Sequence, residues 1–233
     1  MIDGWSSQAL GLAKEKQRIG RGREKLLKTV VRFRLESPGM QIRRVVVVSG
    51  VPGVGKTTIV TDALRMVENQ MKVSLVTYGS VMFEIAERKR LVQNRDELRK
   101  LPVKVQREVQ KLAGERIATM SESQVVVVDT HTLIETEGGF LIGLPKWVAE
   151  ALRPAIIVLV EADPESIALR RERDGTRSRD EQVAETIATH QELCRAAAIA
   201  VGTLTGATVK IIKNVEGKAE EAAKAFAELL LKV

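Results

Sequence analysis

Runs of β-branched and other apolar residues recur along the chain at regular intervals. They lie at residues 44–49, 73–77, 125–128, 155–160 and 208–212. Each run is almost continuous in apolar character, which is typical of strands that are buried on both faces of a sheet. The pattern therefore predicts five buried strands.

Between these runs, apolar residues recur at the three- and four-residue spacing of helices. The segments with this spacing are 56–71, 80–92, 103–121, 146–152, 183–200 and 216–232. Asp163 before Pro164 adds a helix start, because the carboxylate can cap free N–H groups and proline suits the first helical position. Alternating strands and helices predict an α/β fold, with a parallel sheet covered by helices on both faces.

Residues 1–39 differ from the rest of the chain in their charge. The chain has 233 residues and a formal charge of +7. Nine Lys or Arg residues and four acidic residues give 1–39 a net charge of +5, which leaves +2 for the remainder. Pro38 and Gly39 interrupt any helix there, and Met40 follows as a candidate start. We expect a basic extension, 1–39, and one domain, 40–233.

Two explanations of the extension stay open. It reflects an upstream start choice in the gene model, or it is a basic arm that contacts RNA, a membrane or another subunit. The main domain carries a complete pattern of its own, so the extension is expected to be dispensable for its activity.

Composition excludes several classes of protein. No apolar run reaches the roughly 18 residues that a membrane helix needs. Cys194 is the one cysteine, so no intrachain disulfide can form, and a reducing cytoplasm fits. Aromatic residues make up 3% of the chain, too few for a platform that stacks nucleic-acid bases. We expect a cytoplasmic protein without a membrane or nucleic-acid partner, except through residues 1–39.

The strongest chemical signal is a glycine-rich stretch between a predicted strand and a predicted helix. It reads Gly50, Val51, Pro52, Gly53, Val54, Gly55, Lys56, Thr57 and Thr58, and matches G-x-x-x-x-G-K-[ST]. Glycines let successive N–H groups face phosphate oxygens, and the positive end of the helix faces the same way. We therefore expect an ATP-binding P-loop, in which Lys56 reaches the β- and γ-phosphates and Thr57 binds Mg²⁺.

Asp129 follows the valine run 125–128 directly. A carboxylate at the C-terminal end of a parallel strand lies beside the phosphate crevice, so Asp129 is predicted to hold Mg²⁺ together with Thr57. A helix-capping aspartate is the alternative interpretation.

Arginines crowd the segment from 170 to 180. They are Arg170, Arg171, Arg173, Arg177 and Arg179. A transferring phosphoryl group needs cations over its equatorial oxygens, and the planar guanidinium suits that geometry. We expect a short lid over about 170–182, in which Arg177 and Arg179 are catalytic with Lys56 and in which Arg170 and Arg171 are auxiliary. A solvated charged face is the alternative.

His131 and His190 are the two histidines of the chain. Their separation is not a metal signature. His131 lies two residues past Asp129, so a place at the active edge is plausible. His190 lies within a helical segment, where a structural role is the more common one and an auxiliary role beside the lid is the other.

From about Met40 to Val233 the chain resembles the archaeal-type adenylate kinases. The blocks that carry the resemblance, in order, are GVPGVGKTT (50–58), YGSVMFEIA (78–86), RDELRKL (95–101), QKLAGERIA (110–118), VVDTH (127–131), GLPKWV (143–148), TRSRD (176–180), HQELCRAAA (190–198) and TGATVKIIKN (205–214). The resemblance implies a P-loop NTPase-like core with a five-stranded parallel sheet, a helical monophosphate-binding insertion over about 78–121, and an arginine-bearing lid. It also implies Mg²⁺-dependent conversion of ATP and AMP into two ADP, and a homotrimer.

The acceptor side departs from the bacterial-type adenylate kinases. Those enzymes have Gly-Asp-Met-Leu-Arg after the second strand and Asp-Gly-Phe-Pro-Arg after the third, and the first arginine grips the AMP phosphate. Here the aligned runs end in Phe83 and Leu133 instead. The candidate AMP contacts are therefore Tyr78, Arg95, Arg99 and His131, with the two arginines four apart on one helical face.

Two other functions stay open. One is a kinase for another monophosphate, such as CMP or UMP, which a comparison of acceptors at fixed ATP would separate. The other is a P-loop ATPase that holds RNA through its basic first segment. RNA would then raise the ATPase activity of the full chain but not that of a chain starting at Met40.

Either Arg177→Lys or Arg179→Lys is expected to lower the rate of transfer roughly tenfold or more, a barrier rise of about 1.4 kcal/mol. Lysine keeps the charge but loses the planar fork that meets the transition state. ATP affinity without AMP should change much less, because the P-loop supplies that binding. Saturating rates and ATP binding of both variants test this, and unchanged turnover in both would exclude the lid.

Overall fold

The valine-rich strand β1 (Val45–Ser49) is buried along its whole length and lies at the centre of the sheet. The computed structural model describes residues 44–173 and 184–233, which belong to one unit, Arg43–Val233. Its main sheet has five strands in the order β2-β3-β1-β6-β7, and every neighbouring pair is parallel. The other strands are β2 (Val73–Thr77), β3 (Val125–Asp129), β6 (Ile156–Glu161) and β7 (Thr208–Lys213).

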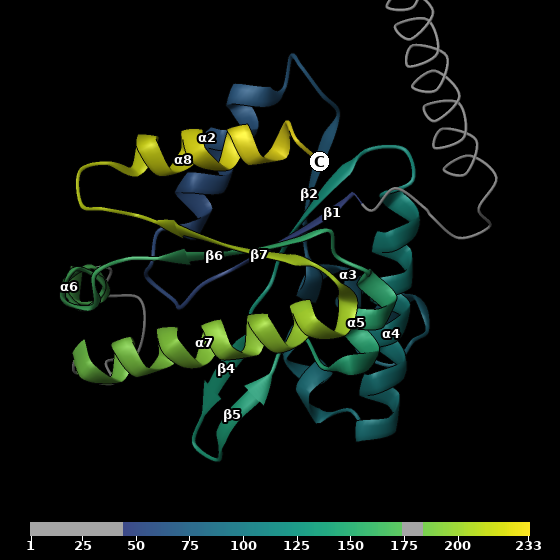
Figure 1. The fold of residues 1–233 in the computed structure, drawn as a ribbon. Helices are drawn as coiled ribbons and strands as arrows, with labels where there is room; N and C mark the ends of the chain where they lie inside the picture. The colour runs from purple at the N-terminus through teal and green to yellow at the C-terminus, as the bar shows by residue number, and fades with distance from the viewer. Residues whose placement is uncertain (1–43, 174–183) are drawn as a thin grey trace, which may run out of the picture. The chain divides into compact units, whose positions relative to one another are not determined.

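Helices connect these strands and cover both faces of the sheet (Figure 1). They are α2 (Lys56–Val67), α3 (Tyr78–Arg88), α4 (Val103–Met120), α5 (Lys146–Leu152), α6 (Pro164–Arg173), α7 (Ala184–Thr205) and α8 (Ala219–Leu230), with a 3₁₀ helix, η1 (Arg95–Lys100). The predicted doubly covered parallel sheet is confirmed. The predicted cap is confirmed too, since the Ser166 N–H donates to the Asp163 carboxylate at 2.9 Å.

Successive side chains of a strand point to opposite faces, and this divides the core into two clusters. Val46 and Val48 point to the face that α2 and α8 cover. Val45 and Val47 point to the other face and pack against residues of α3, α4, α5 and α7. A continuous valine run thus fills both clusters, which is why it carries no alternation in the sequence.

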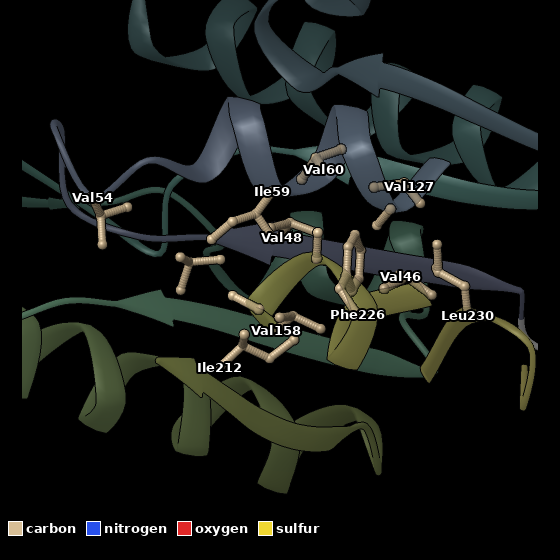
Figure 2. Close-up of a cluster of buried hydrophobic side chains, with 14 of the residues drawn as sticks. Val46, Val48, Val54, Ile59, Val60, Val127, Val158, Ile212, Phe226 and Leu230 are labelled. Carbon is tan, nitrogen blue, oxygen red and sulfur yellow. The ribbon is translucent and has the colours of Figure 1, made fainter. Parts of the chain in front are cut away.

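Figure 2 shows the cluster between the sheet and helices α2 and α8. Phe226 of α8 is fully buried there, near Ile59 of α2 and Val48 of β1. Helix α2 begins at the glycine-rich loop, so the packing of its apolar side against α8 and the sheet holds the start of that helix in place.

The edge strands depart from the prediction of burial on both faces. Leu75 of β2 and Ile211 of β7 are exposed, whereas β1 is buried throughout. An edge strand has one strand neighbour instead of two, so more of its surface stays in contact with solvent. The prediction therefore holds for β1, β3 and β6, and is wrong for β2 and β7.

A separate antiparallel hairpin, β4 (Leu133–Thr136) and β5 (Gly139–Ile142), was not predicted. It lies between β3 and α5, and Figure 1 shows it beside α7. The sequence carried a signal, because the pair Gly138-Gly139 lies between two short runs, and such a pair marks a turn. The hairpin leaves Phe140 and Leu141 exposed.

No helix within 44–173 and 184–233 is long and apolar enough to cross a membrane.

Phe226→Ala is expected to lower the free energy of unfolding by about 3–5 kcal/mol, because the cavity would lie between α8, α2 and the sheet. Denaturant unfolding of the full chain measures this. Met66→Ala, on the exposed side of α2, is the matched control and should change stability by less than about 0.5 kcal/mol. Equal losses in both variants would contradict the packing described above.

Candidate functional site

The loop between β1 and α2 has the backbone that an anion site needs. Gly55 has a left-handed φ of 85°, and Gly53 has one of 84°. Helix α2 begins at Lys56 with no side-chain cap and no acidic residue in its first turn. Its first N–H groups therefore stay available, and the positive end of the helix dipole lies at the same place. The predicted P-loop geometry is present.

Side chains from distant elements hold the carbonyl oxygens of this loop. Arg171 of α6 donates to the Pro52 carbonyl through Nε at 3.0 Å and Nη2 at 2.8 Å. Asn214, directly after β7, donates through Nδ2 to the Val54 carbonyl at 2.8 Å. Arg170 reaches the same carbonyl at 3.4 Å and also pairs with Glu216. Donors outside the loop thus hold it through its carbonyl oxygens.

Lys56 and Asp129 form an ion pair between the start of α2 and the end of β3. They meet because β3 lies beside β1, with Val48 in register with Asp129, so the end of β3 faces the loop that leaves β1. The Lys56 ammonium also lies 3.5 Å from the Thr130 carbonyl oxygen. The structure therefore brings together the predicted phosphate lysine and the predicted metal carboxylate.

Thr57 and Thr58 occupy the first turn of α2, and both are exposed. The Thr57 hydroxyl is thereby available to a ligand at the start of the helix. This placement agrees with the predicted role of Thr57 beside Asp129.

The segment that carries His131 is fastened to the end of β1. The Thr132 N–H donates to Ser49 Oγ at 2.8 Å, and Ser49 Oγ donates to Thr132 Oγ1 at 3.3 Å. Burial, and then the positive charge of Lys56, lower the pKa of His131 below its ordinary value. A backbone hydrogen bond with Gly50 opposes this lowering of the pKa.

The candidate AMP residues Tyr78 and Arg95 differ in their exposure and in their hydrogen bonds. Tyr78 is buried at the start of α3 and donates its hydroxyl to the Gln110 carbonyl of α4, and burial raises its pKa. Its hydroxyl is therefore already hydrogen-bonded within the protein, and the contact of Tyr78 with AMP stays a prediction. Arg95 is exposed and donates to Ser80 Oγ at 3.1 Å, near the start of α3.

The prediction that Arg95 and Arg99 share one helical face is wrong. Both lie in the 3₁₀ helix η1, not in an α-helix. With three residues per turn, positions four apart are about 120° apart around the axis. Asn94 caps this helix, since its Oδ1 accepts from the Glu97 N–H at 3.2 Å. Of the two arginines, Arg95 is the one with a contact to α3.

The predicted lid lies partly outside the described residues. Arg177 and Arg179 fall in the segment 174–183 that the structure does not describe, and their role stays a prediction. Arg170 and Arg171 lie in the last turns of α6 and contact the P-loop as given above. Their auxiliary role therefore has a physical basis, namely contact with the backbone of the loop.

His190 links α7 to the hairpin. Its Nδ1 lies 3.6 Å from a Glu135 carboxylate oxygen of β4, and its ring lies 5.2 Å from that of Phe140. The side chain is buried, its Nε2 has no hydrogen-bond partner, and burial lowers its pKa. These contacts favour the structural interpretation of this histidine.

Similarity to known proteins decides the family. The chain is 50% identical to an adenylate kinase of Methanopyrus kandleri over 186 residues, 96% of that protein and 79% of this chain. The chain belongs to the adenylate kinase family. It is also 48% identical to an adenylate kinase of Methanocaldococcus jannaschii over 188 residues, covering 98% of that protein and 80% of this chain.

A family model described as an AAA domain matches residues 49–188. Among solved structures, a shikimate kinase of Acinetobacter baumannii covers 82% of this chain and 95% of its own, at 17% identity and a TM-score of 0.49.

Mg²⁺, which phosphoryl transfer in this family implies, fits the residues at the site. Magnesium prefers oxygen ligands and keeps several waters, so it needs few groups from the protein. Thr57 and Asp129 supply a hydroxyl and a carboxylate at the loop. Within the described ranges no group of three or more His, Cys, Asp or Glu side chains could hold a metal by itself. The site thus suits an ion held mainly by phosphate and water.

Sequence reasoning missed several residues that fasten the strand ends beside the P-loop. Asn214 grips the P-loop. Gln191 of α7 clamps both the N–H and the carbonyl of Ala162, at 3.1 and 3.0 Å, and Arg195 pairs with buried Glu161 through two contacts of 2.6 Å. Asn214 and Glu161 stand at the C-terminal ends of β7 and β6, as Asp129 does for β3. A polar residue at a strand end was therefore the signal that could have found them.

Lys56→Met is expected to abolish phosphoryl transfer, a loss of at least about a hundredfold, because the ammonium that meets phosphate oxygens is removed. The fold should survive, since Lys56 belongs to the loop and not to the core clusters. ADP formation and thermal unfolding test both statements. Lys89→Met removes an exposed ion pair with Glu108 and is the matched control with normal turnover. Normal turnover of Lys56→Met would remove the P-loop assignment.

Proposed function

We propose that this protein is an adenylate kinase that converts ATP and AMP reversibly into two ADP with Mg²⁺. The observation that carries the proposal is the 50% identity to the Methanopyrus kandleri adenylate kinase over 96% of its length. The P-loop geometry and the Lys56–Asp129 pair support it, because they supply the donor side of a nucleotide kinase.

The reaction needs positioning and charge neutralisation more than acid–base chemistry. An oxygen of the AMP phosphate attacks the γ-phosphorus of ATP, the bond to the β–γ bridging oxygen breaks, and ADP leaves with that electron pair. The attacking oxygen is already anionic, so no general base is required. The second ADP forms from AMP, and no proton changes hands.

The residues divide between holding ATP and stabilising the transfer. N–H groups at the start of α2 receive the phosphates, and Lys56 leaves Asp129 to meet the β- and γ-oxygens. Thr57 and Asp129 hold Mg²⁺, which would neutralise charge that develops on the phosphates. We assign Arg177 and Arg179 to the transferring group, and Arg170 and Arg171 to support of the loop.

On the acceptor side, Arg95 is the cation that we assign to the AMP phosphate. Its contact with Ser80 holds it at the start of α3, which follows β2 at the C-terminal edge of the sheet. His131, in the segment fastened near Asp129, is the second residue that we propose for contact with AMP. Arg99 and Tyr78 are the weaker candidates. Arg99 does not share a helical face with Arg95, and the Tyr78 hydroxyl is already hydrogen-bonded to the Gln110 carbonyl.

We also propose the domain limits that the resemblance implies. Residues 40–233 form the kinase domain, with a monophosphate-binding insertion over about 78–121 and a lid over about 170–182. Within the insertion, Ala86, Val92, Leu98 and Val109 form a small core of their own, which supports treating it as a unit. The extension 1–39 lies outside the described residues.

A homotrimer in the cytoplasm is the assembly that the resemblance implies, and we propose it for this chain. The exposed apolar side chains of the hairpin are surface that another copy could cover. They are Ile134, Phe140, Leu141 and Ile142. Light scattering of the full chain tests the assembly, and the mass of a single chain would contradict it.

ADP formation from ATP with AMP, CMP or UMP, each with and without Mg²⁺, tests the function. AMP with Mg²⁺ is expected to give the highest kcat/KM by at least about tenfold. A preference for CMP or UMP would instead favour the alternative kinase, which the departures at Phe83 and Leu133 keep open. ATP hydrolysis that RNA stimulates, with no transfer to any monophosphate, would favour the RNA-dependent ATPase.

A further inference from the structure

Asn214 sits where the edge strand β7 meets the P-loop. Its backbone N–H donates to the Glu161 carbonyl of β6 at 2.6 Å, which continues the pairing of the two strands by one residue. Its side chain is buried, and Nδ2 donates to the Val54 carbonyl at 2.8 Å. The residue therefore joins the frame of the sheet to the backbone of the nucleotide loop.

The bond to Val54 bears directly on the next N–H group of the loop. In a trans peptide the C=O of one residue and the N–H of the next point in opposite directions. The Val54 carbonyl and the Gly55 N–H belong to one such peptide. An amide that holds the carbonyl toward β7 therefore turns the Gly55 N–H away from β7, toward the inside of the loop.

We propose that Asn214 is a positioning residue of the ATP site, which holds the Val54–Gly55 peptide so that the Gly55 N–H faces the phosphates. The inference deepens the proposed function and rests on the phosphate-binding part of it. Asn214 does not touch the reacting atoms in this role. It acts through the peptide that it holds.

Asn214 packs directly against Gly55, so its contact with the loop depends on both residues. A Cβ at Gly55 would lie 2.4 Å from Asn214 Nδ2, too near for any side chain to be accepted without movement. Gly55 also has a left-handed φ of 85°, which a residue with a side chain adopts with strain. Asn214 can thus reach the loop only because a glycine faces it.

The side-chain oxygen of Asn214 argues against a role in packing alone. Its Oδ1 is buried and has no hydrogen-bond partner. A buried acceptor without a partner lowers stability, so an apolar side chain of the same size would serve packing better. The orientation of the amide is determined by Val54, since a carbonyl oxygen can accept only from the nitrogen side.

Arg170 also donates to the Val54 carbonyl, but its contact differs from that of Asn214 in length and in charge. Its contact is longer, at 3.4 Å, and its guanidinium also pairs with exposed Glu216. Asn214 makes the shorter bond from a buried position and carries no charge. A neutral donor orients the peptide without adding to the cations that bind phosphate, so its effect can be separated from direct attraction.

Asn214→Leu tests the proposal, because leucine has a similar size and cannot donate. In the full chain, the Kd for ATP and the Kd for tripolyphosphate are both expected to rise about tenfold, since the phosphate cradle is disturbed. The Kd for AMP should stay within a factor of two. The ligand-free melting temperature should not fall, because the unpartnered Oδ1 is removed together with the bond.

Asn214→Asp separates the lost donor from a change in charge. It also lacks the donor, so it should weaken tripolyphosphate binding at least as much as Asn214→Leu does. Asn69→Asp is the matched control, because it adds the same charge at an exposed position after α2. It should leave the binding of both ligands unchanged.

Three results would overturn the proposal. Weakening in Asn214→Asp alone would show a charge effect, and weakening for ATP but not for tripolyphosphate would show contact with the base instead. A fall in the melting temperature together with equal losses for ATP and AMP would show a purely structural role. These assays need neither an acceptor nor turnover, so they remain decisive if the kinase prefers another monophosphate. A preference for another monophosphate would appear only in the comparison of acceptors.

Discussion

In the loop between β1 and α2, the backbone carbonyl oxygens and the backbone N–H groups serve different partners. Side chains of the protein bind two of its carbonyl oxygens, and the first N–H groups of α2 are left for an anion. Arg171 binds the Pro52 carbonyl, and Asn214 and Arg170 bind that of Val54. Without these donors, the carbonyls could turn inward, where they would repel phosphate. Contacts within the protein thus hold the loop backbone in this shape, which lowers the cost of ordering it around an anion.

Those donors come from elements that the sheet brings to one edge. Helix α6 follows β6, and Asn214 follows β7, and in a parallel sheet all these strands end on the same side. The buried valines of β1, β3 and β6 hold the strands in register. The same register places Asp129 opposite Lys56. The chemistry of the donor side is thus a consequence of strand order, which in turn depends on core packing.

The region of α3, η1 and α4, which we propose as the acceptor side, has less support from the main core. It has a small apolar cluster of its own, and Arg95 contacts Ser80 through an exposed hydrogen bond. Trp147 of α5 is held by Gln110 through a 2.8 Å bond, and Arg107 of α4 stacks on its ring at 4.5 Å. These contacts join α4 to α5 beside Tyr78. They support the region without forming a phosphate site as complete as the P-loop.

The sequence by itself determined the layout of the fold and the identity of the phosphate loop. Continuous valine runs between amphipathic segments allow little but a parallel sheet covered on both faces, and the glycine–lysine–threonine spacing encodes its geometry locally. Only the tertiary structure decided the rest. Whether Asn214 reaches Val54, whether Gln191 clamps Ala162, and whether Arg95 and Arg99 share a face depend on strand order and on the type of a short helix. These contacts join residues far apart in the chain or depend on a turn of backbone, and neither leaves a periodic trace in the sequence.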